Sequence, residues 1–123
     1  MKKHLLLIDD DIDEFDFIAR IIEEMPMLKF SYASNGKNGL EQMANDMPDI
    51  VLLDMNMPAM NGLECLQKIK KTETLKSIPV YMYSNSHTDS FVNEARQLGA
   101  TDCLKKPGSI EILREMITRV LTT

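Results

Sequence analysis

Two short apolar runs in this chain each end in carboxylates. Asp9 and Asp10 follow Leu5–Ile8, and Asp54 follows Ile50–Leu53. Uninterrupted apolar runs of this kind are typical of strands buried on both faces of a parallel sheet. Because the carboxyl ends of parallel strands meet at one edge of a sheet, where ligands bind in open α/β folds, we expect these carboxylates to lie close together.

Several carboxylates at one buried edge would repel one another or take up protons. A divalent cation removes this cost, and Mg²⁺ commonly binds one or two carboxylates, a carbonyl oxygen and water. The sequence therefore predicts a Mg²⁺ site. The alternative for Asp54 alone is a carboxylate that caps the following turn, and the acids from Asp9 to Asp13 also suit the start of a helix.

Two further polar side chains follow predicted strands. Ser84 comes after Pro79–Tyr83, and Lys106 comes shortly after Thr101–Leu104. A hydroxyl can donate to a phosphoryl oxygen, an ammonium can neutralise its charge, and a carboxylate such as Asp54 can act as a nucleophile toward phosphorus. Each residue alone is better explained as a turn or surface residue. Their occurrence at consecutive strand ends predicts a site for a small anion held through a metal.

Strand and helix patterns alternate along the chain. Apolar runs predict strands at residues 5–8, 30–33, 50–53, 79–83 and 101–104. Apolar residues at helical spacing predict helices around residues 17–25, 40–44, 63–69, 89–98 and 113–121. Pro26 and Gly99 are expected to end the first and fourth helices, and Asn61-Gly62 indicates a turn. This alternation, with short connections, predicts an α/β fold, a doubly wound five-stranded parallel sheet with helices on both faces.

The 123-residue chain is 44% hydrophobic and 27% charged, which is typical of one globular domain. Its net charge of −5 argues against direct nucleic-acid binding, which usually needs a basic face. No apolar stretch is long enough to span a membrane, and the run after Met1–Lys3 is too short for a signal peptide. Cys65 and Cys103 lack metal-ligand spacing, so we expect reduced thiols in a cytoplasmic protein.

The motifs combine into a recognisable pattern. They are Ile8-Asp9-Asp10, Asp54-Met55-Asn56-Met57-Pro58, Asn61-Gly62, Ser84 and Lys106-Pro107. Over the whole chain this pattern resembles the receiver domain of two-component response regulators. The resemblance implies the flavodoxin-like strand order 2-1-3-4-5. It also implies that the protein is not an enzyme but a signalling module, which accepts a phosphoryl group and then switches its contacts with other proteins.

The same resemblance implies roles for single residues. Asp54 matches the phosphoacceptor, which takes a phosphoryl group from the histidine of a sensor kinase or a histidine phosphotransfer protein. Asp9 and Asp10 match the acidic pair that places Mg²⁺ together with Asp54. The backbone carbonyl of Asn56 matches a further ligand of that ion.

Ser84 matches the switch hydroxyl of the family, which moves toward the phosphoryl group. Lys106 matches the lysine that pairs with this group, and the Lys106–Pro107 bond is expected to be cis. Three positions depart from the family pattern, with Cys103 in place of a frequent aromatic residue, Gly108 in place of a frequent Phe, and Asn85 in place of a small residue. None of the three takes part in the phosphorylation chemistry itself.

Residues 1–123 are expected to form a single receiver domain without an output domain, acting on a downstream protein as a monomer or weak dimer. Three other interpretations stay open. A Mg²⁺-dependent phosphatase with an aspartyl nucleophile usually has a second acid where Asn56 stands. A flavin-binding electron carrier needs a phosphate-cradling loop after the first strand, where Asp9–Asp11 would repel a phosphate. A receiver that serves only as a scaffold would not need the complete acidic set.

Overall fold

A computed structural model describes residues 3–85 and 88–122. Within these residues, strands and helices alternate along the chain, as the apolar patterns predict. The strands are β1 (Lys3–Ile8), β2 (Leu28–Ala33), β3 (Ile50–Leu53), β4 (Val80–Ser84) and β5 (Asp102–Lys105). The helices are α1 (Ile12–Ile22), α2 (Gly36–Asn45), α3 (Gly62–Lys71), α4 (Asp89–Gln97) and α5 (Ile110–Leu121).

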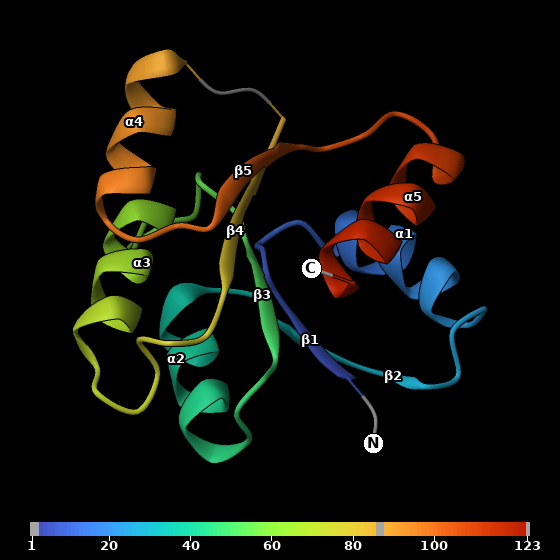
Figure 1. Ribbon diagram of the computed structural model, residues 1–123, viewed down its shortest axis with the longest axis horizontal. Coiled ribbons are helices and arrows are strands. Elements are labelled where there is room, and N and C mark those ends of the chain that lie inside the picture. Colours follow the sequence, from blue (N-terminus) through green and yellow to red (C-terminus); the bar gives the residue numbers. More distant parts are fainter. Residues whose placement is uncertain (1–2, 86–87, 123) are drawn as a thin grey trace.

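The strands form one parallel sheet in the order β2-β1-β3-β4-β5. Helices α1 and α5 cover one face of this sheet, and α2, α3 and α4 cover the other (Figure 1). The doubly wound α/β fold and its strand order are therefore confirmed. Since the strand order changes direction at β1 and β3, the carboxyl ends of these two central strands border the crevice where ligands bind in such sheets.

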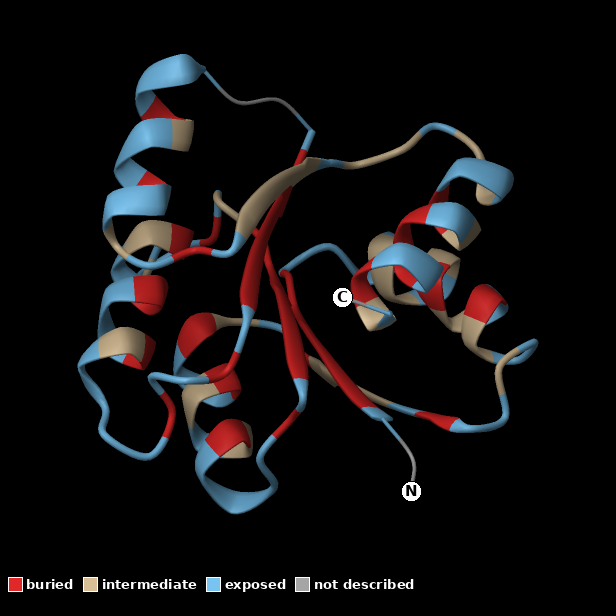
Figure 2. Ribbon diagram, viewed as in Figure 1, coloured by how far each residue is buried: buried red, intermediate tan, exposed pale blue. Residues whose placement is uncertain are grey.

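Two hydrophobic cores lie on opposite faces of the sheet, and the period-two alternation of β1 shows why. Leu5 and Leu7 pack against α1 and α5, whereas Leu6 and Ile8 pack against the helices of the other face. All four side chains are buried, as are the residues of β3 (Figure 2). Each such side chain contributes roughly 1.5–3 kcal/mol of transfer free energy, so the strands that carry the acids are held rigidly.

The Asn61-Gly62 dipeptide starts α3 instead of forming a free turn. Asn61 is the N-cap residue: its side chain accepts from the backbone of Glu64, whose carboxylate in turn accepts from the backbone of Asn61. Gly62 lies directly against the strand end, and a Cβ there would be 2.2 Å from the backbone oxygen of Asp54. Only a glycine fits this close approach.

Two expectations about chain geometry were wrong. The first helix ends at Ile22, and the chain continues to Met25 in tighter turns, in which the N–H of Glu24 donates to the Ile21 oxygen and that of Met25 to the Ile22 oxygen. No cis peptide bond occurs in the described part of the chain, so the Lys106–Pro107 bond is trans. The trans isomer is the intrinsically favoured one for an X-Pro bond.

The described helices include none that is both long and apolar enough to cross a membrane.

Candidate functional site

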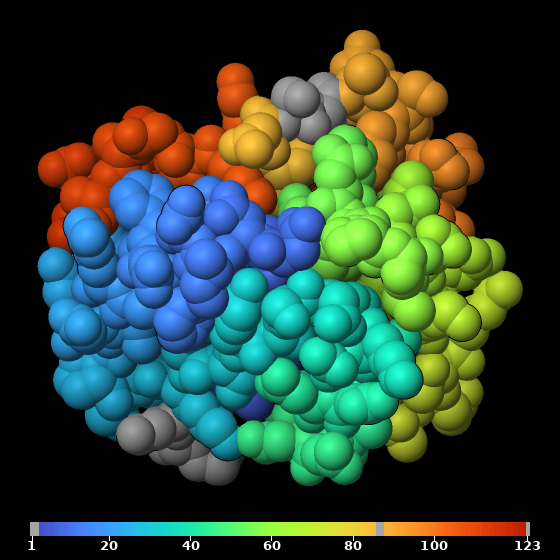
Figure 3. Space-filling model, turned by 180° about the vertical axis from the view of Figure 1, so that it is seen from behind, coloured from blue at the N-terminus to red at the C-terminus, as the bar shows by residue number. Residues whose placement is uncertain are grey.

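The predicted site residues lie at neighbouring strand ends. Asp9 follows β1, Asp54 follows β3, Ser84 is the last residue of β4, and Lys106 follows β5. The segments after β1 (blue), β3 (green), β4 (gold) and β5 (orange) meet on one side of the molecule (Figure 3). The structure therefore brings together side chains from four separate parts of the chain, as the strand-end argument predicts.

Backbone hydrogen bonds fix these positions beyond the ends of the strands. The N–H of Asp9 donates to the Ala33 oxygen at 3.0 Å, and that of Asp54 donates to the Ile8 oxygen at 2.9 Å. The N–H of Lys106 donates to the Ser84 oxygen at 2.7 Å. Each acid or base is thus attached to the neighbouring strand and cannot move far without breaking the sheet.

The three carboxylates form a compact cluster. One oxygen from each of Asp9, Asp10 and Asp54 lies within 4.8 Å of the others. Asp9 and Asp54 are buried, while Asp10 is exposed and opens the cluster to solvent. Close oxygen donors with one open side suit Mg²⁺, which binds a few carboxylates and keeps several waters.

Lys106 is the cation that faces this cluster. Its Nζ lies 2.8 Å from Asp9 Oδ2 and 3.5 Å from Asp54 Oδ1, and its side chain is only 6% exposed. At 2.8 Å this contact is a charge-assisted hydrogen bond as well as an ion pair. Among the described residues, three carboxylates thus face one ammonium, and the excess negative charge of the cluster suits a further cation.

The pKa values of these groups reflect the crowding. Burial raises the pKa of Asp54 to about 7, and the charge of Asp9 adds to this effect while Lys106 opposes it. Burial lowers the pKa of Lys106, but the contact with Asp9 and the charges of Asp54 and Glu14 outweigh it, so the pKa lies above its ordinary value. The ammonium is therefore stable in this site, whereas the Asp54 carboxylate needs additional positive charge to stay fully ionised at neutral pH.

The other two predicted site residues differ in exposure. Ser84 is 3% exposed at the end of β4, next to the cluster along the sheet edge. Asn56 lies two residues after Asp54 in the connection to α3, with an exposed side chain. That its backbone carbonyl binds a metal ion stays a prediction.

Two residues at the site were missed by the sequence analysis. The hydroxyl of Tyr83 donates to Glu14 Oε2 at 3.0 Å, and Lys106 Nζ lies 5.6 Å from the centroid of the Tyr83 ring. Tyr83 has no exposed surface. The local sequence pattern places Tyr83 only in a buried strand, so it carried no signal for the contact with Glu14.

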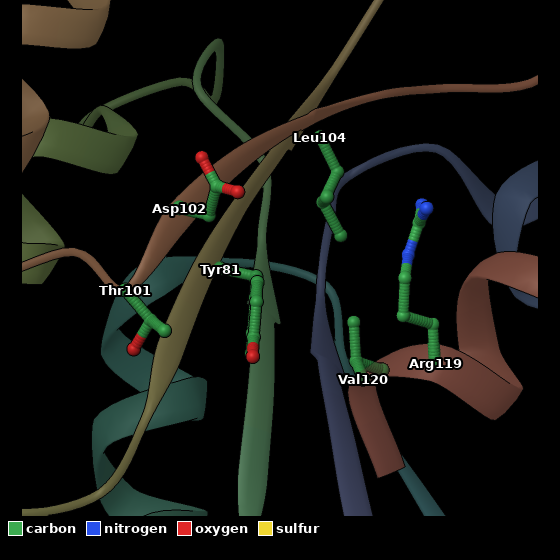
Figure 4. Close-up of a pocket in the computed structure, with 6 residues that line it drawn as sticks. All are labelled: Tyr81, Thr101, Asp102, Leu104, Arg119 and Val120. Carbon is green, nitrogen blue, oxygen red and sulfur yellow. The ribbon is translucent and has the colours of Figure 1, made fainter. Parts of the chain in front are cut away.

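A separate cavity of about 480 Å³ lies between the edge of the sheet and α5. The residues that line it come from β4, the segment before β5, β5 and α5 (Figure 4): Tyr81, Thr101, Asp102, Leu104, Arg119 and Val120. None of the acids of the cluster lines this cavity. The chemistry of the strand ends is therefore independent of it.

Comparison with known proteins agrees with this geometry. A family model for the response regulator receiver domain matches residues 5–118. A curated relative, the two-component response regulator ORR5 of Oryza sativa subsp. japonica, is 30% identical over 96% of this chain and 88% of its own length. The receiver domain of a DNA-binding response regulator from Colwellia psychrerythraea 34H is 28% identical, with a TM-score of 0.85 over 99% of this chain and 100% of that one.

Other relatives are much longer than this chain. A protein-glutamate methylesterase/protein-glutamine glutaminase of Geobacillus kaustophilus is 37% identical over 95% of this chain, but the match covers only 35% of that protein's length. The shared part is the receiver domain, which is a signalling module. The fold, the cluster of strand-end residues and the family match lead to one conclusion: this chain belongs to the response regulator receiver domains of two-component signal transduction.

Proposed function

We propose that Asp54 is the residue that accepts the phosphoryl group, from the phosphohistidine of a sensor kinase or of a histidine phosphotransfer protein. The observation that carries this proposal is the position of its carboxylate. Asp54 is buried, it lies within 4.8 Å of the Asp9 and Asp10 oxygens, and Lys106 is 3.5 Å away. A carboxylate nucleophile beside a cation and beside two further acids that could hold a metal suits phosphoryl transfer.

In the transfer step, a carboxylate oxygen of Asp54 forms a bond to phosphorus while the P–N bond to the donor imidazole breaks. The bonding electron pair leaves with the imidazole nitrogen, which yields neutral histidine after protonation. Lys106 pairs with a phosphoryl oxygen, and Ser84 donates its hydroxyl hydrogen to another. Because Lys106 is already fixed beside Asp54, little reorganisation is needed when charge develops on the phosphoryl oxygens.

Mg²⁺ would be held by Asp9, Asp10 and Asp54, with the backbone carbonyl of Asn56 as a further ligand. When bound, the ion supplies positive charge that the phosphoryl oxygens and the crowded carboxylates lack. The three carboxylate oxygens within 4.8 Å of one another, two of them on buried residues, support this assignment.

We extend this proposal to the partner and the oligomeric state of the protein. The phosphorylated receiver would change its contacts with a downstream protein in the cytoplasm, as a monomer or weak dimer. We propose that residues 1–123 act as one receiver domain, which signals through its contacts with other proteins and not by turnover of other substrates.

The test is phosphorylation by acetyl phosphate, a small donor that needs no docking. Intact-mass measurement is expected to show one added phosphoryl group with Mg²⁺, and none after chelation of the metal or in Asp54→Asn. Asp46→Asn, which removes an exposed carboxylate outside the cluster, serves as the matched control and is expected to be phosphorylated normally. Full phosphorylation of Asp54→Asn would show that another residue is the acceptor.

A further inference from the structure

A buried tyrosine, Tyr83, links strand β4, which ends in Ser84, to helix α1. Tyr83 precedes Ser84 in β4, and its side chain points to the opposite face, into the core formed with α1 and α5. There its hydroxyl donates to Glu14 Oε2 at 3.0 Å, over a separation of 69 residues in sequence. Glu14 lies in the first turn of α1, just after the acidic residues of the cluster.

This pair also borders Lys106. The ammonium lies 5.6 Å from the centroid of the Tyr83 ring, within the range in which a cation is attracted to an aromatic face. The charges of Glu14 and Lys106 also interact: Lys106 acts to lower the pKa of Glu14, although burial leaves that pKa raised, and Glu14 acts to raise the pKa of Lys106. Lys106 therefore has Glu14 as a third acidic neighbour, beside Asp9 and Asp54.

A free Glu14 carboxylate would compete for Lys106. Once a phosphoryl group is present on Asp54, the ammonium must pair with that group, and any carboxylate that draws it away weakens the phosphorylated state. The Tyr83 hydroxyl restrains the Glu14 carboxylate and partly satisfies its charge, since a carboxylate that accepts a hydrogen bond has less need of a second cationic partner.

We propose that Tyr83 and Glu14 are a pair of positioning residues, in which the tyrosine hydroxyl holds the Glu14 carboxylate away from Lys106 so that the ammonium remains available to the phosphoryl group. This inference rests on the proposed function, because it assumes that Lys106 pairs with a phosphoryl group on Asp54. The Tyr83–Glu14 hydrogen bond would affect how strongly Lys106 pairs with the phosphoryl group, in addition to its packing in the core.

The test is the affinity for beryllofluoride, a phosphoryl mimic, measured with Mg²⁺ by ¹⁹F NMR or calorimetry. Tyr83→Phe keeps the ring but releases Glu14, so binding is expected to weaken about threefold or more, because the freed charge competes for the ammonium. Glu14→Gln keeps a hydrogen-bond acceptor but removes the charge, so its binding is expected to equal or exceed that of the wild type. In the double variant, Glu14→Gln is expected to restore most of the affinity lost in Tyr83→Phe.

Two matched controls separate this effect from packing. Tyr81→Phe removes the hydroxyl of another buried tyrosine on the same face of β4, and Glu23→Gln removes an exposed charge at the far end of α1. Both are expected to bind beryllofluoride as the wild type does, and urea unfolding of every variant reports any loss of stability. A purely structural role for the pair predicts no rescue in the double variant.

The outcomes that overturn the inference differ from those that overturn the proposed function. Wild-type affinity in Tyr83→Phe, an equally weak double variant, or weaker binding in Glu14→Gln alone would each overturn it. If Tyr83→Phe does not fold, tighter binding by Glu14→Gln supports the inference, and weaker binding overturns it. If the wild type itself binds no beryllofluoride, or if Asp54→Asn binds it equally well, the proposed function fails instead.

Discussion

Lys106 makes its closer ion pair with Asp9, at 2.8 Å, and a longer one with Asp54, at 3.5 Å. Both acids are buried, so each contact is stronger than a surface ion pair, but each also carries a cost of desolvation. One ammonium cannot balance all the carboxylates of the cluster. At the scale of single residues, the carboxylates therefore repel one another when no metal ion is bound.

Asp54→Asn is expected to stabilise the metal-free protein at pH 7.5, by roughly 1–3 kcal/mol, because it removes one of the crowded buried charges. Burial raises the folded-state pKa of Asp54 to about 7. The folded protein then binds more protons than the unfolded chain between about pH 4 and pH 7, so the stability tied to protonated Asp54 is present at low pH and lost as the pH rises. Urea unfolding at pH 5 and pH 7.5 checks this.

The advantage of Asp54→Asn is expected to be smaller at pH 5, and to shrink at pH 7.5 when millimolar Mg²⁺ is added. A variant that is less stable than the wild type at both pH values without metal would contradict this account of the site.

The two cysteines are expected to differ in reactivity. Burial raises the pKa of Cys65 to about 12, and burial together with the charge of Asp102 raises the pKa of Cys103. Since the thiolate is the nucleophile, both react slowly at pH 8, but only Cys103 is partly exposed. Iodoacetamide is expected to label Cys103 first in the folded protein and both residues at similar rates in urea, as measured by peptide mass. Earlier labelling of Cys65 in the folded state would show that α3 opens.

The start of α3 is the element that most closely supports Asp54. The N–H of Gly62 donates to the Met55 oxygen at 2.8 Å, and the capping box at Asn61 and Glu64 holds the first turn in place. The end of β3 and the start of α3 therefore behave as one rigid unit. Changes within this unit should affect stability and phosphorylation together.

Gly62→Ala is expected to damage both properties. The new Cβ would meet the Asp54 oxygen at 2.2 Å and the Met55 Cα at 2.8 Å, and backbone atoms cannot move aside cheaply. We expect a loss of about 1–3 kcal/mol in urea unfolding and slower phosphorylation by acetyl phosphate. Gly108→Ala is the matched control, since a Cβ there has open space. Normal phosphorylation of Gly62→Ala would show that the strand end tolerates the shift.

Phe15, on α1, lies close to the acidic residues, and its position in the sequence suits either the edge of the core or contact with the histidine donor. Its ring stacks on Phe30, with 5.6 Å between ring centroids, and lies tilted against Tyr32, with 4.9 Å between centroids, which gives it a packing role. Phe15→Leu keeps most of this burial. It is expected to slow transfer from the cognate phosphohistidine donor while leaving acetyl phosphate labelling intact. Equal loss in both assays would assign Phe15 to packing alone.

At the scale of the whole molecule, the sheet separates two hydrophobic cores. Cys103 packs beside the core under α3 and α4, whereas Tyr83 belongs to the core under α1 and α5. If Ser84 moves toward a phosphoryl group, a cysteine side chain is too small to fill the vacated space, and an unfilled methyl-sized void costs about 1 kcal/mol. We therefore expect signal transmission through β5 and α4 to be weakly favoured unless a partner stabilises it.

Amide hydrogen exchange with and without beryllofluoride is expected to show the largest protection near Asn56 and Ser84, with small changes in α4 and β5. Exchange measured by mass spectrometry at the peptide level is sufficient to separate these segments. Changes centred on Cys103 and α4 would show that this chain uses the fifth strand despite its missing aromatic residue.

Much of the fold and of the site could be predicted from the sequence, because the signals involved are local. The apolar runs Leu5–Ile8 and Ile50–Leu53 indicated buried strands, and the residues after them were placed together by the rule that parallel strands end at one edge. The strand order came from the resemblance to receiver domains, not from periodicity. The family motifs likewise supplied the expected roles of Lys106 and Ser84, whereas their positions at strand ends were read from the apolar runs.

Only the tertiary structure decided which side chains meet at that edge. Tyr83 and Glu14 are 69 residues apart, and nothing in either local pattern indicates that one donates to the other. The closer approach of Lys106 to Asp9 and the fit of Gly62 against the Asp54 oxygen also depend on how β1, β3, β5 and α3 pack. The physical reason is the distance along the chain over which each signal acts. Burial patterns repeat within a few residues of sequence. Hydrogen-bond and ion-pair partners lie on segments that only folding brings within about 3 to 4 Å of each other.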